Sequence, residues 1–417
     1  MRVTRLKLAN VRPIEMAEFG FQPGFNLIVG VNGVGKTTVL DALSFCLRAV
    51  VRESVRRITR GDAFTNDDIR VGADALDVEC ETGIGDKSYR YLLHKTRSAT
   101  VAQAKKAGRV REQVHETPDR EEFIGGTPKL SKGLAPGGRP FALLFSTNRA
   151  VPTERAPSKG VAAGGIPAAY AEAFSCRELR LVEFASWLRA QQALRREKRS
   201  IQGVLDAFEN TVRRFLAGYS NLRVSDDDPP KLLIDHGKTT LSARQLSDGE
   251  RGTLAMVLDL TRRLAQANPE MADPAAEAEA VVLIDELDLH LHPKWQRQIV
   301  RDLTAAFPKC QFIATTHSPQ IIGEVEHERI QIIVNGQVYS PTHSYGVDSS
   351  RVLEEIMGSE PRAQEVKKLL SQISGVIGKH QFAHARGLIE KLVERLGESD
   401  PEVTRLRTLI DFVEGKE

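Results

Sequence analysis

A chain of 417 residues is long enough for two or three domains, and its 58 lysine and arginine residues nearly balance its 55 aspartate and glutamate residues. This balance excludes a chain-wide positive field, so a nucleic-acid contact would need a local basic patch. The cysteines Cys46, Cys80, Cys176 and Cys310 lie far apart, which argues against a disulfide framework or a zinc knuckle. No apolar run approaches about 18 residues, so we predict a soluble, cytoplasmic protein that does not enter a membrane.

Residues 30–38 fit the phosphate-binding loop pattern G-x-x-x-x-G-K-S/T at every defined position. An apolar run, 25–29, precedes this P-loop and a helical pattern, 39–47, follows it, which is the strand–loop–helix context that the motif requires. We expect Lys36 to reach the β and γ phosphates of ATP and the Thr37 hydroxyl to ligate Mg²⁺. The predicted ATP-binding residues are Gly30, Asn32, Gly33, Gly35, Lys36, Thr37 and Thr38.

The following interval reads in three parts. Short runs from Asp67 to about His94 alternate apolar and polar residues, which predicts an antiparallel β lobe. Residues of about 98–165 are polar, basic and rich in Gly, Ala and Pro, which predicts a mobile insertion and a linker. A segment of about 170–220 is strongly helical in pattern.

Many basic residues fall on this helical segment and just before the β lobe. They could form a surface that contacts phosphates on a dimer, or they could be a solvated helix face, and the sequence leaves both open. These residues are Arg52, Arg56, Arg57, Arg60, Arg177, Arg180, Arg189, Arg195, Arg196, Lys198 and Arg199.

Three further motifs follow in chain order. Residues 246–251, which we call the signature segment, place Ser247 and Gly249 at the start of a predicted helix, where they make an anion site. The run 280–284 predicts a buried strand that ends in Asp285, expected in the Mg²⁺ shell, and Glu286, expected to polarise the attacking water. A second buried strand, 311–316, ends at His317.

The segment 285–293, which we call the D-loop, contains an H-x-H pair. Asp285, Asp288, His290 and His292 could ligate a metal ion, since residues two apart on a strand share a face. The other interpretation, which we favour, is a structural loop that leads into a helix at Pro293, and the family resemblance given next implies that this loop crosses a dimer interface.

The four motifs in this order resemble the head of an ABC-type ATPase of the SMC/RecF branch. The resemblance implies an α/β fold with a mixed or parallel sheet core and an antiparallel β lobe, in which Ser247, Gly249 and Glu250 act in trans on a second head, with two ATP per dimer. It also implies that His317 contacts the γ-phosphate. Asn148 stands where a glutamine is usual in the family and is a weak Mg²⁺-shell candidate.

Residues 346–417 form a separate element in which apolar residues from Phe382 to Leu396 and from Val403 to Val413 predict a helical hairpin, after an ATPase head over 1–345. The second helix has an N-cap at Asp400 followed by Pro401. Together with Arg362, the segment 345–357 resembles the tail of the PtuA-type ATPases of Septu anti-phage systems and their retron-linked relatives.

That resemblance implies the sensor or regulatory subunit of a prokaryotic defence complex, with ATP and Mg²⁺ as cofactors, a second copy of the chain and a co-encoded HNH-type nuclease as partners, and possible nucleic-acid contact. No D-x-D cluster follows His317, so we place no nuclease site in this chain. Alternatives are a RecF-like DNA repair ATPase and an ATP-bound scaffold with little turnover. Glu286 beside Asp285 argues against the scaffold.

Overall fold

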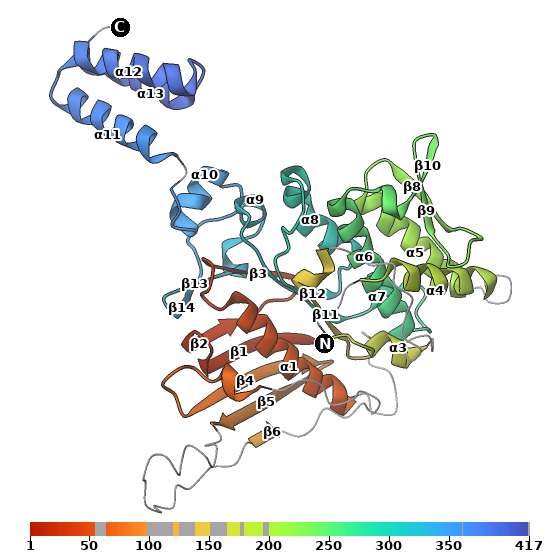
Figure 1. The fold of residues 1–417 in the computed structure, drawn as a ribbon. Coiled ribbons are helices and arrows are strands. Elements are labelled where there is room, and N and C mark those ends of the chain that lie inside the picture. The colour runs from red at the N-terminus through yellow and green to blue at the C-terminus, as the bar shows by residue number, and fades with distance from the viewer. Residues whose placement is uncertain are drawn as a thin grey trace, which may run out of the picture. The chain divides into compact units, whose positions relative to one another are not determined.

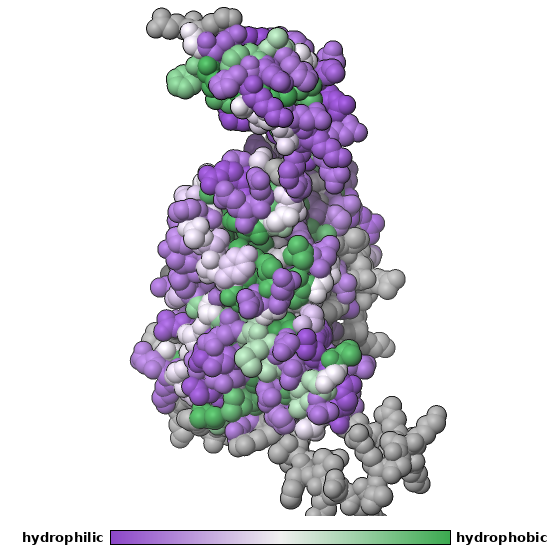
Figure 2. Space-filling model, turned by 90° about the vertical axis from the view of Figure 1, so that its left-hand side faces the viewer, coloured by the Kyte–Doolittle hydropathy of each residue, from purple (hydrophilic) through white to green (hydrophobic). Residues whose placement is uncertain are grey.

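The computed structural model describes residues 1–54, 64–97, 120–124, 138–150, 165–175, 179–194, 200–360 and 362–415. The chain divides into two compact units, Met1–Ser349 and Ser350–Glu417 (Figure 1). In the described part of the chain, no helix is long and apolar enough to cross a membrane. Figure 2 shows one face of the molecule, on which hydrophilic side chains predominate and hydrophobic ones form small groups between them.

A six-stranded mixed sheet forms the core of the first unit, in the order β14-β13-β3-β12-β11-β7. All neighbours in it run parallel except β14, which pairs antiparallel with β13 at one edge. Every residue of β3, β11 and β12 is buried, which explains their nearly unbroken apolar runs. The strands are β3 (Phe25–Val29), β7 (Ala142–Phe145), β11 (Ala280–Ile284), β12 (Cys310–Thr315), β13 (Ile330–Val334) and β14 (Gln337–Tyr339).

An antiparallel sheet in the order β2-β1-β4-β5-β6 makes the predicted β lobe. Its strands are β1 (Arg2–Val11), β2 (Ile14–Gly20), β4 (Ala75–Ile84), β5 (Lys87–Thr96) and β6 (Arg120–Ile124). The helix α1 (Lys36–Ser54) contacts strands of both sheets and so lies between them (Figure 1). The predicted α/β class, with a mixed core sheet and an antiparallel lobe, is confirmed.

The strand β6 falls inside the segment for which we predicted a mobile insertion. It pairs with β5 in a register that sets Phe123 opposite Tyr91, and the two rings lie 5.1 Å apart between centroids. This cross-strand contact between two aromatic rings stabilises the pairing of β6, a short and mostly polar strand. The composition of the segment alone did not indicate a strand here. Residues 138–150 also fall inside the predicted insertion, and there the prediction was wrong, because they contain β7, a buried strand of the core sheet. Residues 98–119, 125–137 and 151–164 lie outside the described residues.

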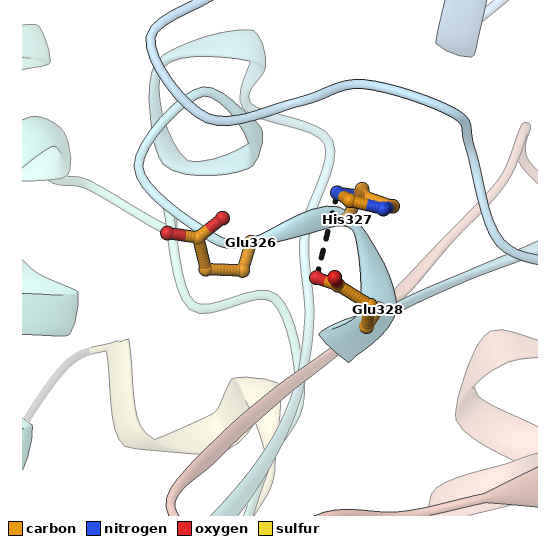
Figure 3. A group of neighbouring side chains, drawn as sticks. All are labelled: Glu326, His327 and Glu328. Carbon is orange, nitrogen blue, oxygen red and sulfur yellow. Dashed lines mark ion pairs between the residues drawn. The ribbon is translucent and has the colours of Figure 1, made fainter.

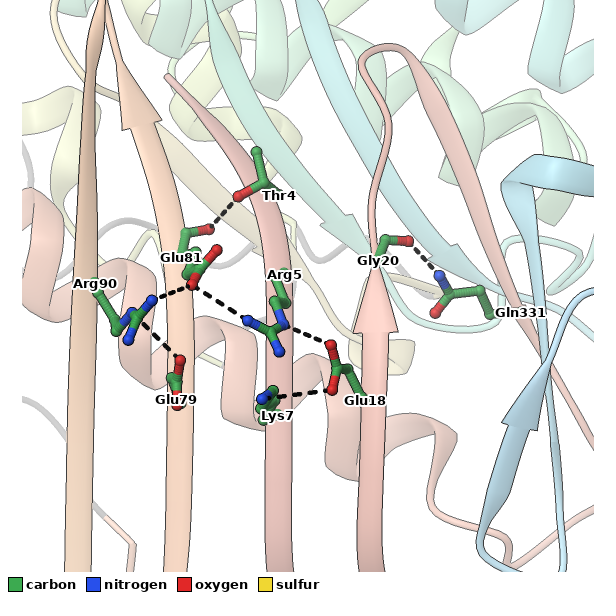
Figure 4. A network of polar contacts seen from close by, with 9 residues as sticks. All are labelled: Thr4, Arg5, Lys7, Glu18, Gly20, Glu79, Glu81, Arg90 and Gln331. Atoms are coloured by element: carbon green, nitrogen blue, oxygen red, sulfur yellow. Dashed lines mark hydrogen bonds and ion pairs between the residues drawn. The ribbon is translucent and has the colours of Figure 1, made fainter.

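A ladder of alternating charges runs across one face of the antiparallel sheet (Figure 4). It consists of Arg90 with Glu79 and Glu81, Arg5 with Glu81 and Glu18, and Lys7 with Glu18, at distances from 2.6 to 3.6 Å. Such exposed pairs each contribute only about 0–1 kcal/mol. We interpret this face as a solvated surface.

A third sheet, in the order β10-β9-β8, and a group of helices complete the first unit. The strands are β8 (Tyr219–Val224), β9 (Leu232–His236) and β10 (Thr239–Ser242). The helices are α3 (Ile166–Tyr170), α4 (Leu181–Leu194), α5 (Ser200–Phe215), α6 (Asp248–Ala267), α7 (Pro274–Glu277), α8 (Pro293–Ala306) and α9 (Pro319–Ile322), with short 3-10 turns η1 (Asn66–Asp68), η2 (Thr147–Ala150), η3 (Ala243–Gln245) and η4 (His327–Arg329).

The second unit is helical and has its own core. After α10 (Ser349–Arg351) and a π-helical turn, Val352–Ile356, come α11 (Gln364–Gly378), α12 (Phe382–Leu396) and α13 (Pro401–Glu414). The helices α12 and α13 correspond to the expected hairpin, and α11 adds a third helix that we did not predict. The buried core residues are Val366, Ile373, Ile377, Ala385, Ile389, Leu392, Val403, Leu406 and Ile410.

The two ends of α13 differ in how well the sequence predicted them. As expected, Asp400 caps its start by accepting a hydrogen bond from the amide of Glu402 (2.9 Å), ahead of Pro401. Val413, expected on the apolar face, is exposed instead.

Candidate functional site

The P-loop joins the end of β3 to the start of α1, as its pattern predicts. Lys36 is the first residue of α1 and is buried, and its Nζ donates to the main-chain oxygens of Gly30 (2.9 Å) and Val31 (3.0 Å). Burial lowers the pKa of Lys36, while nearby carboxylates oppose the shift. Gly35 has a φ of 104° in close contact with Pro13 and Ile14, so a side chain there would be strained and crowded.

The end of β11 brings a carboxylate to the P-loop. The hydroxyl of Thr37 donates to Asp285 Oδ2 (3.1 Å), and the hydroxyl of Thr315, at the end of β12, donates to Asp285 Oδ1 (2.6 Å). Asp285 is buried, whereas Thr37, Asn32 and Gly33 are exposed at the mouth of the loop. The Thr37 hydroxyl and the Asp285 carboxylate, which are in contact, offer oxygen ligands of the kind that Mg²⁺ prefers, so these residues fit that ion.

Glu286 follows directly and has an unusual backbone conformation, with a φ of 49°. Its amide donates to Thr315 Oγ1 (2.7 Å), and its carbonyl oxygen accepts from Arg149 Nη2 (2.6 Å). A non-glycine residue in this region is strained and persists only where its surroundings fix it. Together with a third bond, from the amide of Leu289 to the same carbonyl oxygen (3.0 Å), these hydrogen bonds hold Glu286 at the end of the strand.

His317 follows β12 and is half-buried. Burial is the main cause that lowers its pKa below the ordinary value of 6.5, and the charge of Lys36 lowers it further. The amide of His317 and the hydroxyl of Thr316 both donate to Asp288 Oδ1, at 3.2 and 2.6 Å. Asp288 thus ties the D-loop to the segment that carries His317.

The contacts of the H-x-H segment favour the structural interpretation. His292 Nδ1 accepts from the amide of Lys294 (3.3 Å) and so caps α8, and His290 has a φ of 60°. In the described ranges, the only close group of three metal-ligating side chains is Glu326, His327 and Glu328 (Figure 3). These are consecutive surface residues, and we assign them no metal site.

The signature segment forms the N-terminus of α6. Ser247 and Glu250 make a reciprocal capping box, in which the amide of Ser247 donates to Glu250 Oε2 (2.9 Å) and the amide of Glu250 donates to Ser247 Oγ (3.4 Å). Tyr219 donates to the other oxygen of Glu250 (3.0 Å). Gly249 packs so closely that an added Cβ would fall on the carbonyl oxygen of His290, so the signature segment and the D-loop touch within one chain.

The structure thus brings Lys36, Thr37, Asp285, Glu286 and His317 to one edge of the sheet. Arg149 also belongs to this place, and we did not predict it. Its neighbour Asn148, the residue that we did single out, is exposed on η2. A basic residue four positions after the end of the buried run 142–145 is only a weak signal, because a parallel strand ends at the ligand edge of such a sheet.

The basic residues proposed for phosphate contact are only partly described. Arg56, Arg57, Arg60, Arg177, Arg195, Arg196, Lys198 and Arg199 lie outside the described residues, as does the basic part of the insertion. Arg189 donates to the carbonyl oxygens of Ser225 and Asp227, each at 2.6 Å, so it has a structural role.

Comparison with known proteins links the chain to two groups of ATPases. Residues 5–129 match a family described as AAA domain, and residues 164–323 match a family described as AAA domain, putative AbiEii toxin, Type IV TA system. Over 212 residues the chain is 37% identical to the Retron Ec83 probable ATPase of Escherichia coli, covering 50% of this chain and 39% of the relative. Over 379 residues it is 23% identical to Septu protein PtuA of Bacillus thuringiensis, covering 85% and 84%.

Among solved structures, the chain is similar to the SMC head bound to the C-winged helix domain of ScpA. The TM-score is 0.49 at 15% identity, covering 82% of this chain and 98% of that one. The chain spans well under half the length of the retron relative that it matches. The sequence matches confirm the resemblance to the Septu and retron-linked ATPases: the chain is related in sequence to the retron probable ATPases and to Septu protein PtuA.

Proposed function

We propose that this chain binds ATP with Mg²⁺ and hydrolyses it to ADP and inorganic phosphate. The observation that carries the proposal is the contact of the Thr37 hydroxyl with the Asp285 carboxylate, 3.1 Å apart, at the mouth of a P-loop and next to Glu286. Lys36 there bonds two neutral carbonyl oxygens. A phosphate oxygen is a stronger acceptor for an ammonium, since a charge-assisted hydrogen bond is roughly twice as strong as a neutral one.

The chemical roles follow from the positions of the side chains. Mg²⁺, held by Thr37 and by Asp285 through water, would neutralise charge on the phosphates. Lys36 would bind the phosphates, and Glu286 would accept a proton from the attacking water. His317, whose lowered pKa favours the neutral imidazole, would contact the γ-phosphate. The residues Gly30, Gly33, Gly35, Asn32 and Thr38 would form the remainder of the phosphate cradle.

Two substitutions separate binding from hydrolysis. Lys36→Ala should greatly weaken ATP binding, because the phosphates lose a buried cation. Glu286→Gln should leave ATP bound while lowering kcat by about 10²–10⁴-fold, because it removes the base and keeps the shape. Calorimetry and a phosphate-release assay measure both, and Glu328→Gln, an exposed carboxylate away from the P-loop, is the control. Equal hydrolysis by wild type and Glu286→Gln would disprove the assigned base.

We further propose that two copies of the chain form composite ATP sites, with Ser247, Gly249 and Glu250 acting in trans, and that the assembly regulates a separate nuclease in anti-phage defence. The similarity to Septu protein PtuA over most of both chains supports this role. The purified chain with Mg²⁺ or Mn²⁺ should then leave DNA and RNA intact, and cleavage should need a co-encoded HNH-type partner. Metal-dependent cleavage by this chain alone, lost on a point substitution in it, would contradict the proposal.

A further inference from the structure

Arg149 is a buried cation whose hydrogen bonds go to the main chain. It is 6% exposed, and its Nη1 donates to the carbonyl oxygens of Ser146 (2.9 Å) and Asp285 (2.5 Å). Its Nη2 donates to the carbonyl oxygen of Glu286 (2.6 Å). Among the described residues it forms no ion pair. Burial lowers the pKa of Arg149 to about 10, and the nearby carboxylates oppose that shift.

These acceptors are informative because two of them belong to the predicted catalytic pair. The Glu286 carbonyl oxygen also accepts from the amide of Leu289 (3.0 Å), whereas the Asp285 carbonyl oxygen lies where the strand ladder stops and needs a donor. One guanidinium supplies that donor to two consecutive residues through its two Nη atoms. The bond to Glu286 is also made at the residue whose φ of 49° requires outside support.

We infer that Arg149 is a positioning residue for ATP hydrolysis, which sets the main chain of Asp285 and Glu286 so that the Glu286 carboxylate faces the attacking water. It acts through the main-chain carbonyl oxygens that it bonds. The inference rests on the proposed ATPase function. It assigns a role in that function to a residue that lies 136 positions before Asp285 in the chain.

The geometry explains why an arginine is needed. A guanidinium presents donors on two separate nitrogens in a fixed plane, whereas a lysine has a single nitrogen on a flexible stem. Lysine at this position would keep the charge and lose the simultaneous bonds to Asp285 and Glu286. The Arg149→Lys variant therefore separates the role of the fork from that of the charge.

The test compares Arg149→Lys and Arg149→Ala with the wild-type full chain. We expect the ATP dissociation constant to stay within about threefold, while kcat falls on the order of 10²-fold, the loss expected for a misplacement of about 1 Å. Methylguanidinium in the buffer should restore part of the kcat of Arg149→Ala and none of the kcat of the Arg149→Ala/Glu286→Gln double variant. The matched control is Arg139→Ala, which removes another arginine that donates to a main-chain carbonyl, that of Ala267 (2.7 Å), and should leave kcat unchanged.

Hydrogen exchange gives a readout that does not depend on activity. Without nucleotide, amides of 286–291 should exchange faster in both Arg149 variants, since the amide of Leu289 bonds the same Glu286 carbonyl (3.0 Å). Unchanged exchange there, unchanged kcat, or a parallel loss of ATP binding and thermal stability would overturn the inference. If the wild-type chain does not hydrolyse ATP, or if Glu286→Gln hydrolyses it equally well, the proposed function is wrong instead.

Discussion

Thr315 shows at the scale of one residue how the site is held. Its side chain is completely buried, and its single hydroxyl donates to Asp285 Oδ1 (2.6 Å) and accepts from the amide of Glu286 (2.7 Å). A hydroxyl can do both because it has one proton and two lone pairs. The position therefore couples the end of β12 to both members of the predicted catalytic pair.

Thr315→Val keeps the shape and removes both bonds. We expect the free energy of unfolding to fall by about 1–3 kcal/mol, because the Glu286 amide and one oxygen of Asp285 lose a buried partner. ATP hydrolysis should fall with it, and Thr315→Ser should restore most of both. Urea denaturation and a phosphate-release assay measure the effects. Thr261→Val is the control, since the buried Thr261 donates only to the carbonyl of Val257 in its own helix (2.8 Å). Equal losses in the two valine variants would show that Thr315 has no special role.

Lys36, Thr37 and Asp285 could be predicted from the sequence because each belongs to a short local pattern whose ends meet at one sheet edge. Arg149 and Thr315 could not, since they act on main-chain atoms of a distant segment. Hydrogen bonds to a backbone leave no spacing pattern in the sequence, and a lone arginine or threonine after a buried strand has many possible partners. Three-dimensional contacts were needed to find them.

At the scale of an element, α6 shows where the sequence pattern was insufficient. Apolar residues such as Leu254 and Leu258 predict one buried face, yet Arg263 on the same helix is only 1% exposed. Its Nε donates to Asp259 Oδ2 (2.8 Å), and its Nη1 donates to the carbonyls of Ala169 and Ala171 at the end of α3. We had predicted a linker that ends at about residue 165, directly before α3, so nothing in the sequence indicated that α3 would pack on α6.

The charged side of α6 gives a stability prediction. Asp259 bonds both Arg262 (2.6 Å) and Arg263, and all three are buried. Asp259→Asn should lower the free energy of unfolding by about 3–5 kcal/mol, because it leaves buried arginine charge without its carboxylate.

The control for Asp259→Asn is Asp227→Asn, which breaks an exposed pair with Lys231 (2.8 Å) and should change stability by less than about 1 kcal/mol. Chemical denaturation of both variants, measured at the same pH, makes the comparison. Similar small losses in the two variants would contradict the importance of the buried cluster.

At the scale of the whole molecule, the sequence pattern indicated two helices of the C-terminal unit and missed the third. Residues 382–396 and 401–413 have regular apolar spacing and clear caps, whereas α11 was not recognised within the tail. Its buried residues Val366, Ile373 and Ile377 complete the core that α12 and α13 could not close as a pair. An isolated amphipathic pair leaves part of its apolar stripe uncovered, and the third helix removes that difficulty.

The arrangement of the head gives the last prediction, on assembly. Ser247 is exposed at the N-terminus of α6. The side-chain hydrogen bonds described for the signature segment join Ser247 with Glu250, Tyr219 with Glu250 and Arg251 with Asp248, and none of them reaches the P-loop of the same chain. An exposed helix N-terminus is suited to the phosphates of ATP bound by a second copy. Because Gly249 touches the D-loop at His290, such an approach would also reach the segment that carries Glu286.

Ser247→Arg should therefore bind ATP normally and fail to hydrolyse it, because the new cation faces the opposing Lys36. Lys36→Ala should also fail to hydrolyse ATP, because it no longer binds ATP, while its own signature segment is intact. A 1:1 mixture of the two variants should regain about a quarter of wild-type activity, since half of the two-fold dimers are mixed and each mixed dimer has one intact composite site out of two. Ser371→Arg, at an exposed serine on α11, is the control and should retain full activity alone. A phosphate-release assay on the mixture and sizing chromatography with ATP and Mg²⁺ make the measurement. If no ratio of the two variants recovers hydrolysis while each still folds, the site works within one chain and the composite dimer is wrong.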